Sequence, residues 1–390
     1  MKSRSSSKEI ILICNGFQYN ITGAIFENLI LNFASNKVAI TLIQTPLTKF
    51  DSREIRIKKI RFSSIEEYRI PIPVAPPLSF LLDLAIAFCA LRASIVISFS
   101  PHFGYVSLLL KKLRPSLRVI QWSIDFSPRR FRNTILQSLY EFVDCRTFLT
   151  SDFHVDVSEP ALEARIQRYL GSVLNENETR KRKIVVRVGI PEGYLGKLGS
   201  ENFHLKRVFF LGNLNPTVGI DTFVHVAKEV LSYIPNSSFH VIGSGSELIN
   251  SIHLAESLGI SERFNWYGNL EKTEFELLLK TASVGLAPYK SGMNSFSQFA
   301  DPSKLKNYMQ FAIPFVVTDI PLVVQELKVK QIGTVTADSI LEIARETIKL
   351  LQVQDYWVKQ RDNIYEFAKT QTWEKQLETF NIIIRNFLMP

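Results

Sequence analysis

The segment 301–321, DPSKLKNYMQFAIPFVVTDIP, constrains the fold of this 390-residue chain more than any other part of it. Pro302 and Ser303 are typical of a helix start, and a short helix is predicted after them. Residues 314–318 then form a buried strand. A helix N-terminus carries free N–H groups and about half a positive charge, so it stabilises an anion in front of it. Because the ammonium of Lys304 would lie in the first turn, the segment predicts a phosphate site.

Composition places the chain among ordinary globular proteins. It is 46% hydrophobic and 21% charged, and its length allows two cores of about 150 to 200 residues each. The three cysteines, Cys14, Cys89 and Cys145, have neither disulfide-framework nor zinc-site spacing, so we expect core thiols in a reducing compartment. The apolar run 10–14 is too short for a signal peptide. We therefore expect two domains and a cytoplasmic location.

The net charge of +9 is uneven along the chain. Residues 1–190 contain 27 Lys and Arg against 16 Asp and Glu, whereas residues 191–390 contain 19 against 21. Such a basic half is attracted to anionic lipid headgroups, phosphate-bearing substrates or nucleic acid, although any one cluster can be merely solvated surface. Aromatic residues do not interleave with the clusters as a base-stacking platform requires, so an anionic membrane surface is expected and nucleic acid is not. The basic clusters lie at 53–61, 111–118, 129–132 and 180–183.

The first half begins with a predicted strand (9–16), a helix and a second strand (38–44), an order that implies a parallel sheet. Thr22 and Gly23 fall where the helix begins, and we expect them to hold an anionic group of an acceptor. This signal is weak by itself. Charged strands and a Pro-rich loop are predicted over 53–77.

Residues 78–98 are almost continuously apolar and approach the length of a membrane span. Asp83 and Arg92 would each cost roughly 2.5 to 3.5 kcal/mol at the membrane centre. A buried helix over 79–92 and a central strand over 94–99 are therefore expected, with an interfacial role for the helix as the alternative.

Two polar residues follow predicted strands, where the ligand crevice of an open parallel sheet lies. His102 follows the strand 94–99 in a loop, and Asp125 follows the strand 119–124. A carboxylate held by rigid backbone and partly desolvated suits a general base. The alternatives are a satisfied loop histidine and a carboxylate that caps or pairs with Arg129 or Arg130.

The rest of the chain continues the alternation of strands and helices. In the first half we predict helices at 106–113, 132–143 and 158–170, the last capped by Ser158, and strands at 145–149 and 183–188. In the second half we predict strands at 207–211, 239–242, 264–268, 283–287 and 314–318, with loops at their ends. Helices are predicted at 221–234, 339–352 and 372–388, the last with the apolar stripe Trp373, Leu377, Phe380, Ile384 and Phe387.

Segment 301–321 resembles the nucleotide-sugar-binding signature of GT-B glycosyltransferases of the family 4 type, a Pro-Ser-Lys-Leu-x-Glu-Tyr-Met-like helix followed by Gly-x-Pro-Val-Val. The N-terminal half resembles that family in architecture and in the stretch WSIDFSP (122–128). The resemblance implies an α/β protein of GT-B architecture, two Rossmann-like parallel-sheet domains facing a central cleft. It implies an acceptor domain (1–189), a linker (190–206), a donor domain (207–371) and a C-terminal helix (372–390) that returns to the first domain.

By the same resemblance, the donor nucleotide sugar contacts the second domain, and Lys304 and the helix N-terminus stabilise the departing diphosphate without a metal or other cofactor. The implied donor-binding residues are Gly212, Asn213, Gly243, Gly245, Asn269, Tyr289, Ser303, Lys304 and Asn307.

The sequence departs from the family pattern at four positions. An Arg and a Lys that neutralise the diphosphate are replaced by Asn213 and Val218, and two glutamates eight positions apart are replaced by Phe299 and Asn307. Asn307 can still hydrogen-bond ribose hydroxyls, whereas Phe299 cannot replace a carboxylate. The residues that could take its place are Asp301 and Gln298.

The function that we predict is transfer of a sugar from a nucleotide sugar to a lipid-linked or polysaccharide acceptor in cell-envelope or exopolysaccharide assembly. The enzyme would be peripheral to the inner face of the membrane, and a retaining or an inverting outcome stays open. The alternative is a catalytically inactive GT-B protein that acts as a binding or partner subunit, because the Arg, Lys and Glu residues are missing.

Overall fold

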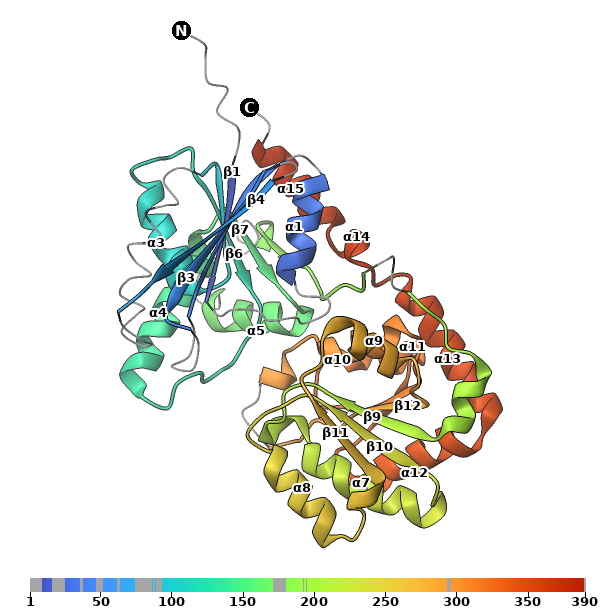
Figure 1. Cartoon of the computed structure of the whole chain (residues 1–390). Coiled ribbons are helices and arrows are strands. Elements are labelled where there is room, and N and C mark those ends of the chain that lie inside the picture. Colours follow the sequence, from blue (N-terminus) through green and yellow to red (C-terminus); the bar gives the residue numbers. More distant parts are fainter. Residues whose placement is uncertain are drawn as a thin grey trace. The chain divides into compact units, whose positions relative to one another are not determined.

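The structure is a computed structural model (Figure 1). It describes residues 9–15, 25–35, 38–46, 52–61, 64–73, 86, 88, 93–170, 180–191, 193, 195–292 and 296–388. These residues form two compact units. The first contains the chain up to Arg187 and the segment from Leu377 onward, and the second contains Val188–Gln376.

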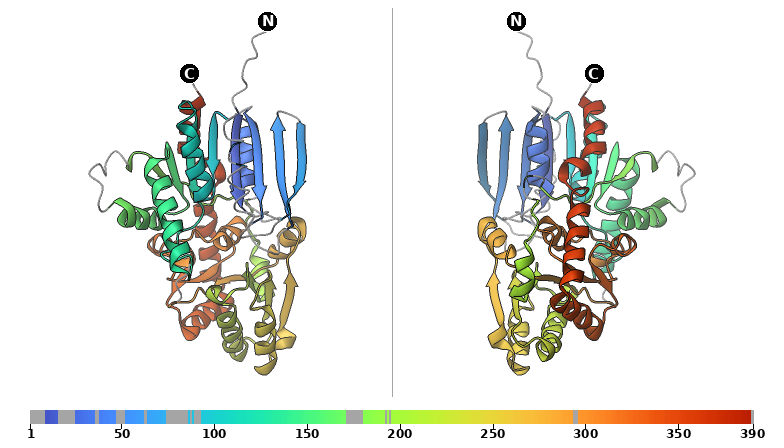
Figure 2. Two further views of the ribbon diagram at one scale, coloured as in Figure 1. Left: turned by 90° about the vertical axis from the view of Figure 1, so that its left-hand side faces the viewer. Right: turned by 90° about the vertical axis from the view of Figure 1, so that its right-hand side faces the viewer.

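The described part of the first unit contains an eight-stranded sheet in the order β4-β3-β2-β1-β5-β6-β7-β8. Neighbouring strands pair in parallel, except that β3 runs antiparallel to both β2 and β4. Figure 2 shows the charged hairpin β3–β4 at one edge of the sheet. The strands are β1 (Glu9–Asn15), β2 (Ala39–Thr45), β3 (Glu54–Arg61), β4 (Ser64–Pro71), β5 (Ile95–Ser98), β6 (Arg118–Ser123), β7 (Phe153–Asp156) and β8 (Lys183–Val185).

Two helices of the first unit, α4 and α5, begin at polar caps that the sequence places just before them. The side chain of Asn133 accepts hydrogen bonds from the N–H groups of Ile135 and Leu136, each 3.0 Å long. Ser158 Oγ accepts from the N–H of Ala161 at 3.1 Å, as predicted for the helix that it precedes. The helices are α1 (Ile25–Ser35), α3 (Pro101–Lys111), α4 (Thr134–Thr150) and α5 (Glu159–Leu170).

Two predictions for the first half were wrong. Residues 145–149 are the last turns of α4, and the strand is β7, which follows them. Helix α3 begins five residues earlier than predicted, so His102 lies in its first turn rather than in a loop. The predicted helix 79–92 lies outside the described residues except for positions 86 and 88. No helix in the described part of the chain is both long and apolar enough to cross a bilayer.

The C-terminal segment packs on the first unit from Leu377 onward, whereas the resemblance implied that this begins at residue 372. Its predicted helix is interrupted at Leu377, giving α14 (Trp373–Gln376) and α15 (Glu378–Leu388). Helix α15 lies beside α1 (Figure 1). The ring of Phe380 is fully buried, with its centre 5.0 Å from that of Trp122 and 6.3 Å from that of Phe33.

The described part of the second unit contains a six-stranded parallel sheet in the order β11-β10-β9-β12-β13-β14, which confirms the predicted Rossmann-like domain. All five predicted strands are present, and β14 is an additional one. The strands are β9 (Arg207–Leu211), β10 (Ser238–Ile242), β11 (Phe264–Gly268), β12 (Val284–Ala287), β13 (Phe315–Thr318) and β14 (Thr334–Thr336).

Helices of the second unit surround an apolar core. Segment 190–206, predicted as a linker, contributes Leu198 and Phe203 to that core and ends in a 3-10 helix, so it is part of this domain. The helices are α7 (Ile220–Tyr233), α8 (Leu248–Ser257), α9 (Lys272–Leu279), α10 (Ser303–Gln310), α11 (Val324–Lys330), α12 (Ile340–Gln352) and α13 (Gln354–Ala368).

Candidate functional site

Three loops of the second domain meet at the carboxyl ends of β9, β10 and β11. The N–H of Gly212 donates to the carbonyl of Ile242 at 3.0 Å, and the N–H of Gly243 donates to the carbonyl of Gly268 at 2.8 Å. These backbone bonds join the loops into one surface at the edge where open parallel sheets bind ligands.

Close backbone approach explains a glycine at position 243. Its φ of +138° is unfavourable for residues with a side chain, and a Cβ atom would lie 2.0 Å from the carbonyl oxygen of Gly212. The two loops can lie this close only because position 243 has no side chain.

Lys304 reaches this surface from the first turn of α10, which begins at Ser303 as predicted. Its side chain is buried, yet Nζ has no hydrogen-bond partner among the described residues. Nζ lies 4.3 Å from the ring centre of Phe210, 4.8 Å from that of Tyr289 and 4.0 Å from where a Cβ atom on Gly212 would be. The ammonium therefore points at the glycine loop after β9.

The electrostatics of this site favour an anion. Burial lowers the pKa of Lys304 to about 7, because the surroundings disfavour the charged ammonium. Burial, and then the nearby Asp301 carboxylate, raise the pKa of the Tyr289 hydroxyl. A buried ammonium without an acceptor is costly, whereas a phosphate oxygen would both bond it and stabilise its charge. The side chains around Lys304 thus fit a phosphate.

The other predicted donor-binding residues lie around Lys304 and differ in how exposed they are to solvent. Ser244 Oγ donates to Asn269 Oδ1 at 3.2 Å, which links the loops after β10 and β11. Asn213 Oδ1 lies 2.6 Å from where a Cβ atom on Gly245 would be. Ser303 is exposed at the start of α10, and Asn307 is half-buried one turn later.

Asp301 and Gln298 differ in their freedom to replace the missing glutamate. The Asp301 carboxylate accepts from the N–H of Val188 at 2.9 Å and pairs with Lys306 at 3.5 Å. It thus holds the beginning of the domain against α10. Gln298 is exposed at the end of the 3-10 helix Phe296–Gln298, which leaves its amide available to a ligand.

The sequence prediction missed two residues near this centre. Phe210 has no sequence signal, because it reads as an ordinary core residue of β9. Lys290 follows Tyr289 at the end of β12, and the rule that polar residues after parallel strands face the ligand edge could have identified it. Its N–H donates to the carbonyl of Thr217 at 3.2 Å, and its ammonium pairs with Asp221 at 2.7 Å. The backbone of Lys290 therefore contacts the turn that contains Val218, and its ammonium is paired with Asp221 in the first turn of α7.

In the first domain, His102 and Asp125 follow the neighbouring strands β5 and β6, as predicted. Arg130 forms an ion pair with Asp125 Oδ1, which is the pairing considered as its alternative role. Buried Arg165 donates to the Asp125 carbonyl at 2.6 Å and to Asp156 Oδ1 at 3.1 Å. The Asp125 loop is thus held at both its backbone and its side chain.

The two predicted acceptor residues, Thr22 and Gly23, lie outside the described residues.

Solved structures with this two-domain fold match nearly the whole chain. Sucrose-phosphate synthase from Thermosynechococcus elongatus is 13% identical, with a TM-score of 0.72 over 98% of this chain and 99% of that chain. HepE from Anabaena in complex with UDP is 12% identical, with a TM-score of 0.70 over 97% and 100%. WaaG, a glycosyltransferase involved in lipopolysaccharide biosynthesis, is 14% identical, with a TM-score of 0.70 over 96% and 99%. These matches show the GT-B fold.

A family assignment follows from the sequence of the second domain. Residues 201–371 match the family model Glycosyl transferases group 1, and this range contains the glycine loops and Lys304. The protein is therefore a glycosyltransferase by this match and by its fold, and its second domain is similar in sequence to the group 1 family. No curated protein matches the chain significantly by sequence.

Proposed function

We propose that the protein transfers a sugar from a nucleotide-diphosphate sugar to a lipid-linked or polysaccharide acceptor in cell-envelope or exopolysaccharide assembly, at the inner face of the membrane. The observation that carries this proposal is Lys304, a buried ammonium without a hydrogen-bond partner in the described structure, aimed at the loop after β9.

The chemistry follows from charge. Transfer breaks the bond between the sugar and the nucleotide diphosphate, so negative charge develops on the departing phosphate oxygen. Donors fixed in a desolvated site stabilise that charge most effectively. Lys304 and the N-terminus of α10 would supply this stabilisation without a metal ion. Asp125 is the candidate that would accept the proton of the acceptor hydroxyl, with His102 in the first turn of α3, the helix that follows the adjacent strand.

Two similarities support the choice of substrates. HepE, which has the same fold, was solved with UDP, and WaaG acts in lipopolysaccharide biosynthesis. The basic first half of the chain agrees with an acceptor that bears phosphate or lies on an anionic membrane.

Calorimetric titration of the full chain with UDP, GDP, ADP and dTDP tests the proposal. We expect one diphosphate to bind, with an affinity that EDTA does not change. Sugars carried by the nucleotide that binds would then be tested for transfer to lipid-linked acceptors. Failure of every diphosphate to bind would contradict a donor site at Lys304 and favour the inactive partner-subunit alternative.

A further inference from the structure

Helix α4 of the first domain exposes an apolar face to solvent. Ile135, Leu139 and Phe142 recur at i, i+4 and i+7, which places them on one face of the helix. Ile135 is 78% exposed and Leu139 is 59% exposed. The opposite face contains Asp144 and Phe148, which are buried. The apolar stripe therefore faces away from the core of the domain.

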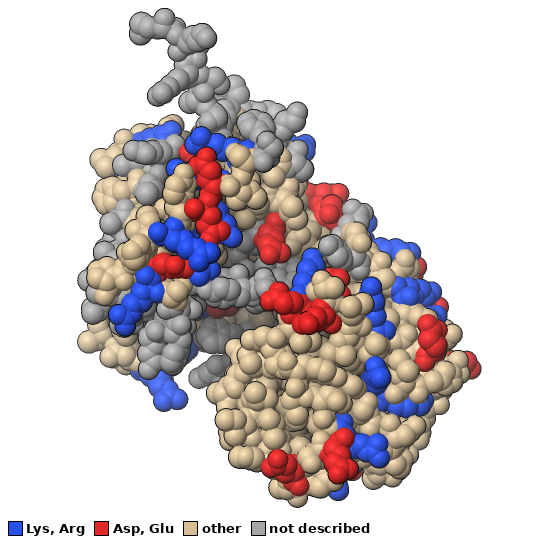
Figure 3. Space-filling model, in the orientation of Figure 1, with Lys and Arg blue, Asp and Glu red and all other residues tan. Residues whose placement is uncertain are grey.

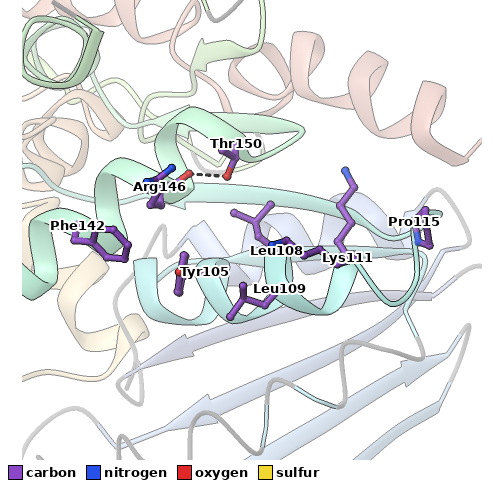
Figure 4. Close-up of a pocket in the computed structure, with 9 residues that line it drawn as sticks. Tyr105, Leu108, Leu109, Lys111, Pro115, Phe142, Arg146 and Thr150 are labelled. Carbon is purple, nitrogen blue, oxygen red and sulfur yellow. Dashed lines mark hydrogen bonds between the residues drawn. The ribbon is translucent and has the colours of Figure 1, made fainter. Parts of the chain in front are cut away.

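A groove continues this apolar face toward α3. It has a volume of about 660 Å³, and Figure 4 shows its lining side chains on α3, on the turn after it and on α4. The rings of Tyr105 and Phe142 pack edge to face across it, with centres 5.9 Å apart. Leu109 is exposed on the α3 side, and Leu113 is exposed just beyond the end of that helix. We call the exposed apolar residues Leu109, Leu113, Ile135, Leu139 and Phe142 the α3–α4 face.

Positive charge surrounds the α3–α4 face. Residues 101–150 contain 8 Lys and Arg against 3 Asp and Glu. Nearby carboxylates have internal partners, because Glu141 pairs with Arg168 and Asp152 pairs with Lys111. In contrast, Lys112, Arg132 and Arg146 are exposed and form no ion pair with any carboxylate of the described structure.

This arrangement differs from the basic cluster at 53–61. There, Arg56 pairs with Glu54 at 2.5 Å and Lys58 with Glu67 at 3.5 Å, so much of the positive charge on the hairpin is compensated. Figure 3 shows basic and acidic side chains intermixed on one face of the first domain. The cluster around α3 and α4 combines uncompensated charge with apolar residues exposed on two adjacent helices.

We propose that the α3–α4 face docks on an anionic lipid bilayer. Helices that lie in a membrane interface have this composition, with Lys and Arg at the level of the headgroups and Leu, Ile and Phe in the acyl boundary. Charge complementarity selects the anionic surface, and the apolar stripe provides the partial insertion. The inference rests on the proposed function insofar as an enzyme acting on a lipid-linked acceptor must reach the membrane.

The test is flotation of the full-length protein with vesicles of phosphatidylcholine alone and of phosphatidylcholine with phosphatidylglycerol. We expect binding to the anionic vesicles only, and a steep loss of binding between 0.1 and 1 M salt, where the Debye length falls from about 10 to about 3 Å. Two variants test insertion and charge separately. The apolar variant carries Ile135→Ser and Leu139→Ser. The charge variant carries Lys112→Gln, Arg132→Gln and Arg146→Gln.

Each basic residue near an anionic surface contributes about fivefold in partitioning, so the charge variant is expected to bind on the order of a hundredfold more weakly. The apolar variant is expected to bind at least about tenfold more weakly. Each variant has a matched control at exposed residues of the second domain. The apolar control carries Val329→Ser and Leu341→Ser, and the charge control carries Lys280→Gln, Lys328→Gln and Lys359→Gln. Both controls should bind vesicles as the wild type does.

Anionic-vesicle binding that both α3–α4 variants retain would overturn the proposal. So would a wild-type dimer, measured by light scattering, that the apolar variant dissociates without loss of vesicle binding, because the face would then join two copies. UDP titration of every variant separates this proposal from the proposed function. Vesicle binding without nucleotide binding contradicts only the donor site, and nucleotide binding without vesicle binding contradicts only the docking surface.

Discussion

The ammonium of Lys304 lies 4.3 Å from the ring centre of Phe210, in a buried position where no described hydrogen-bond acceptor reaches it. An aromatic face compensates a cation only partly. This position is therefore one that a phosphate would stabilise, and it makes Lys304 the most informative residue to change.

We expect Lys304→Ala to weaken the binding of UDP or GDP by about tenfold to 150-fold, because a charge-assisted hydrogen bond contributes roughly 1.5 to 3 kcal/mol. Calorimetry of both forms measures the difference. Lys280→Ala, an exposed lysine of the same domain, is the control and should bind as the wild type. Equal affinities for Lys304→Ala and the wild type would exclude Lys304 from the donor site.

Nucleotide binding should weaken as the pH rises above 7. Burial lowers the pKa of Lys304 to about 7, so the free protein loses this proton above that pH, whereas a bound diphosphate favours the protonated form. The affinity is expected to fall by up to about tenfold per pH unit until the pKa of the bound state is reached. Calorimetry at pH 8 in buffers of different ionisation enthalpy should show proton uptake that Lys304→Ala abolishes. Uptake that persists in the variant would assign the proton to another group.

A change of Arg130 distinguishes the two roles considered for Asp125, general base and structural ion-pair partner. As a general base, Asp125→Asn should lower kcat by about 10² to 10⁴ with donor affinity unchanged, and the product should have inverted configuration. Arg130→Leu removes the ion pair but leaves the carboxylate, so it should then cost much less. Similar small losses in both variants, with retained configuration, would show that the pair is structural.

The C-terminal helix should be energetically part of the first domain. Phe380 is fully buried against Trp122 and Phe33, and truncation of such a ring to alanine costs about 3 to 5 kcal/mol. We expect Phe380→Ala to lower the free energy of unfolding of that domain by this amount. Ile382→Ala, on the exposed face of the same helix, should change it by less than about 1 kcal/mol. Urea unfolding followed by tryptophan fluorescence measures both.

The sequence predicted the second domain well for a physical reason. Each of β9, β10 and β11 is a short, mostly apolar run followed closely by a glycine, a pattern with few competing interpretations. Pro302 likewise predicted that α10 starts at Ser303.

The errors lie where polar residues are buried. Strand β7 was placed too early because His154 and Asp156 interrupt its apolar pattern. These two residues pair with each other, and Asp156 also pairs with Arg165 on α5. Helix α13 was missed because its sequence is largely polar. The burial of Lys304 over Phe210 depends on the close approach of α10 and β9, which no local pattern records.

The return of residues from Leu377 onward to the first unit has a consequence for biosynthesis. The second unit is continuous in sequence from Val188 to Gln376, so all of it leaves the ribosome before Phe380 does. Domains generally fold as units during synthesis. Most of the first unit is translated first, but the surface around Trp122 stays uncovered until α15 has been synthesised. The second unit can therefore fold before the first unit is complete.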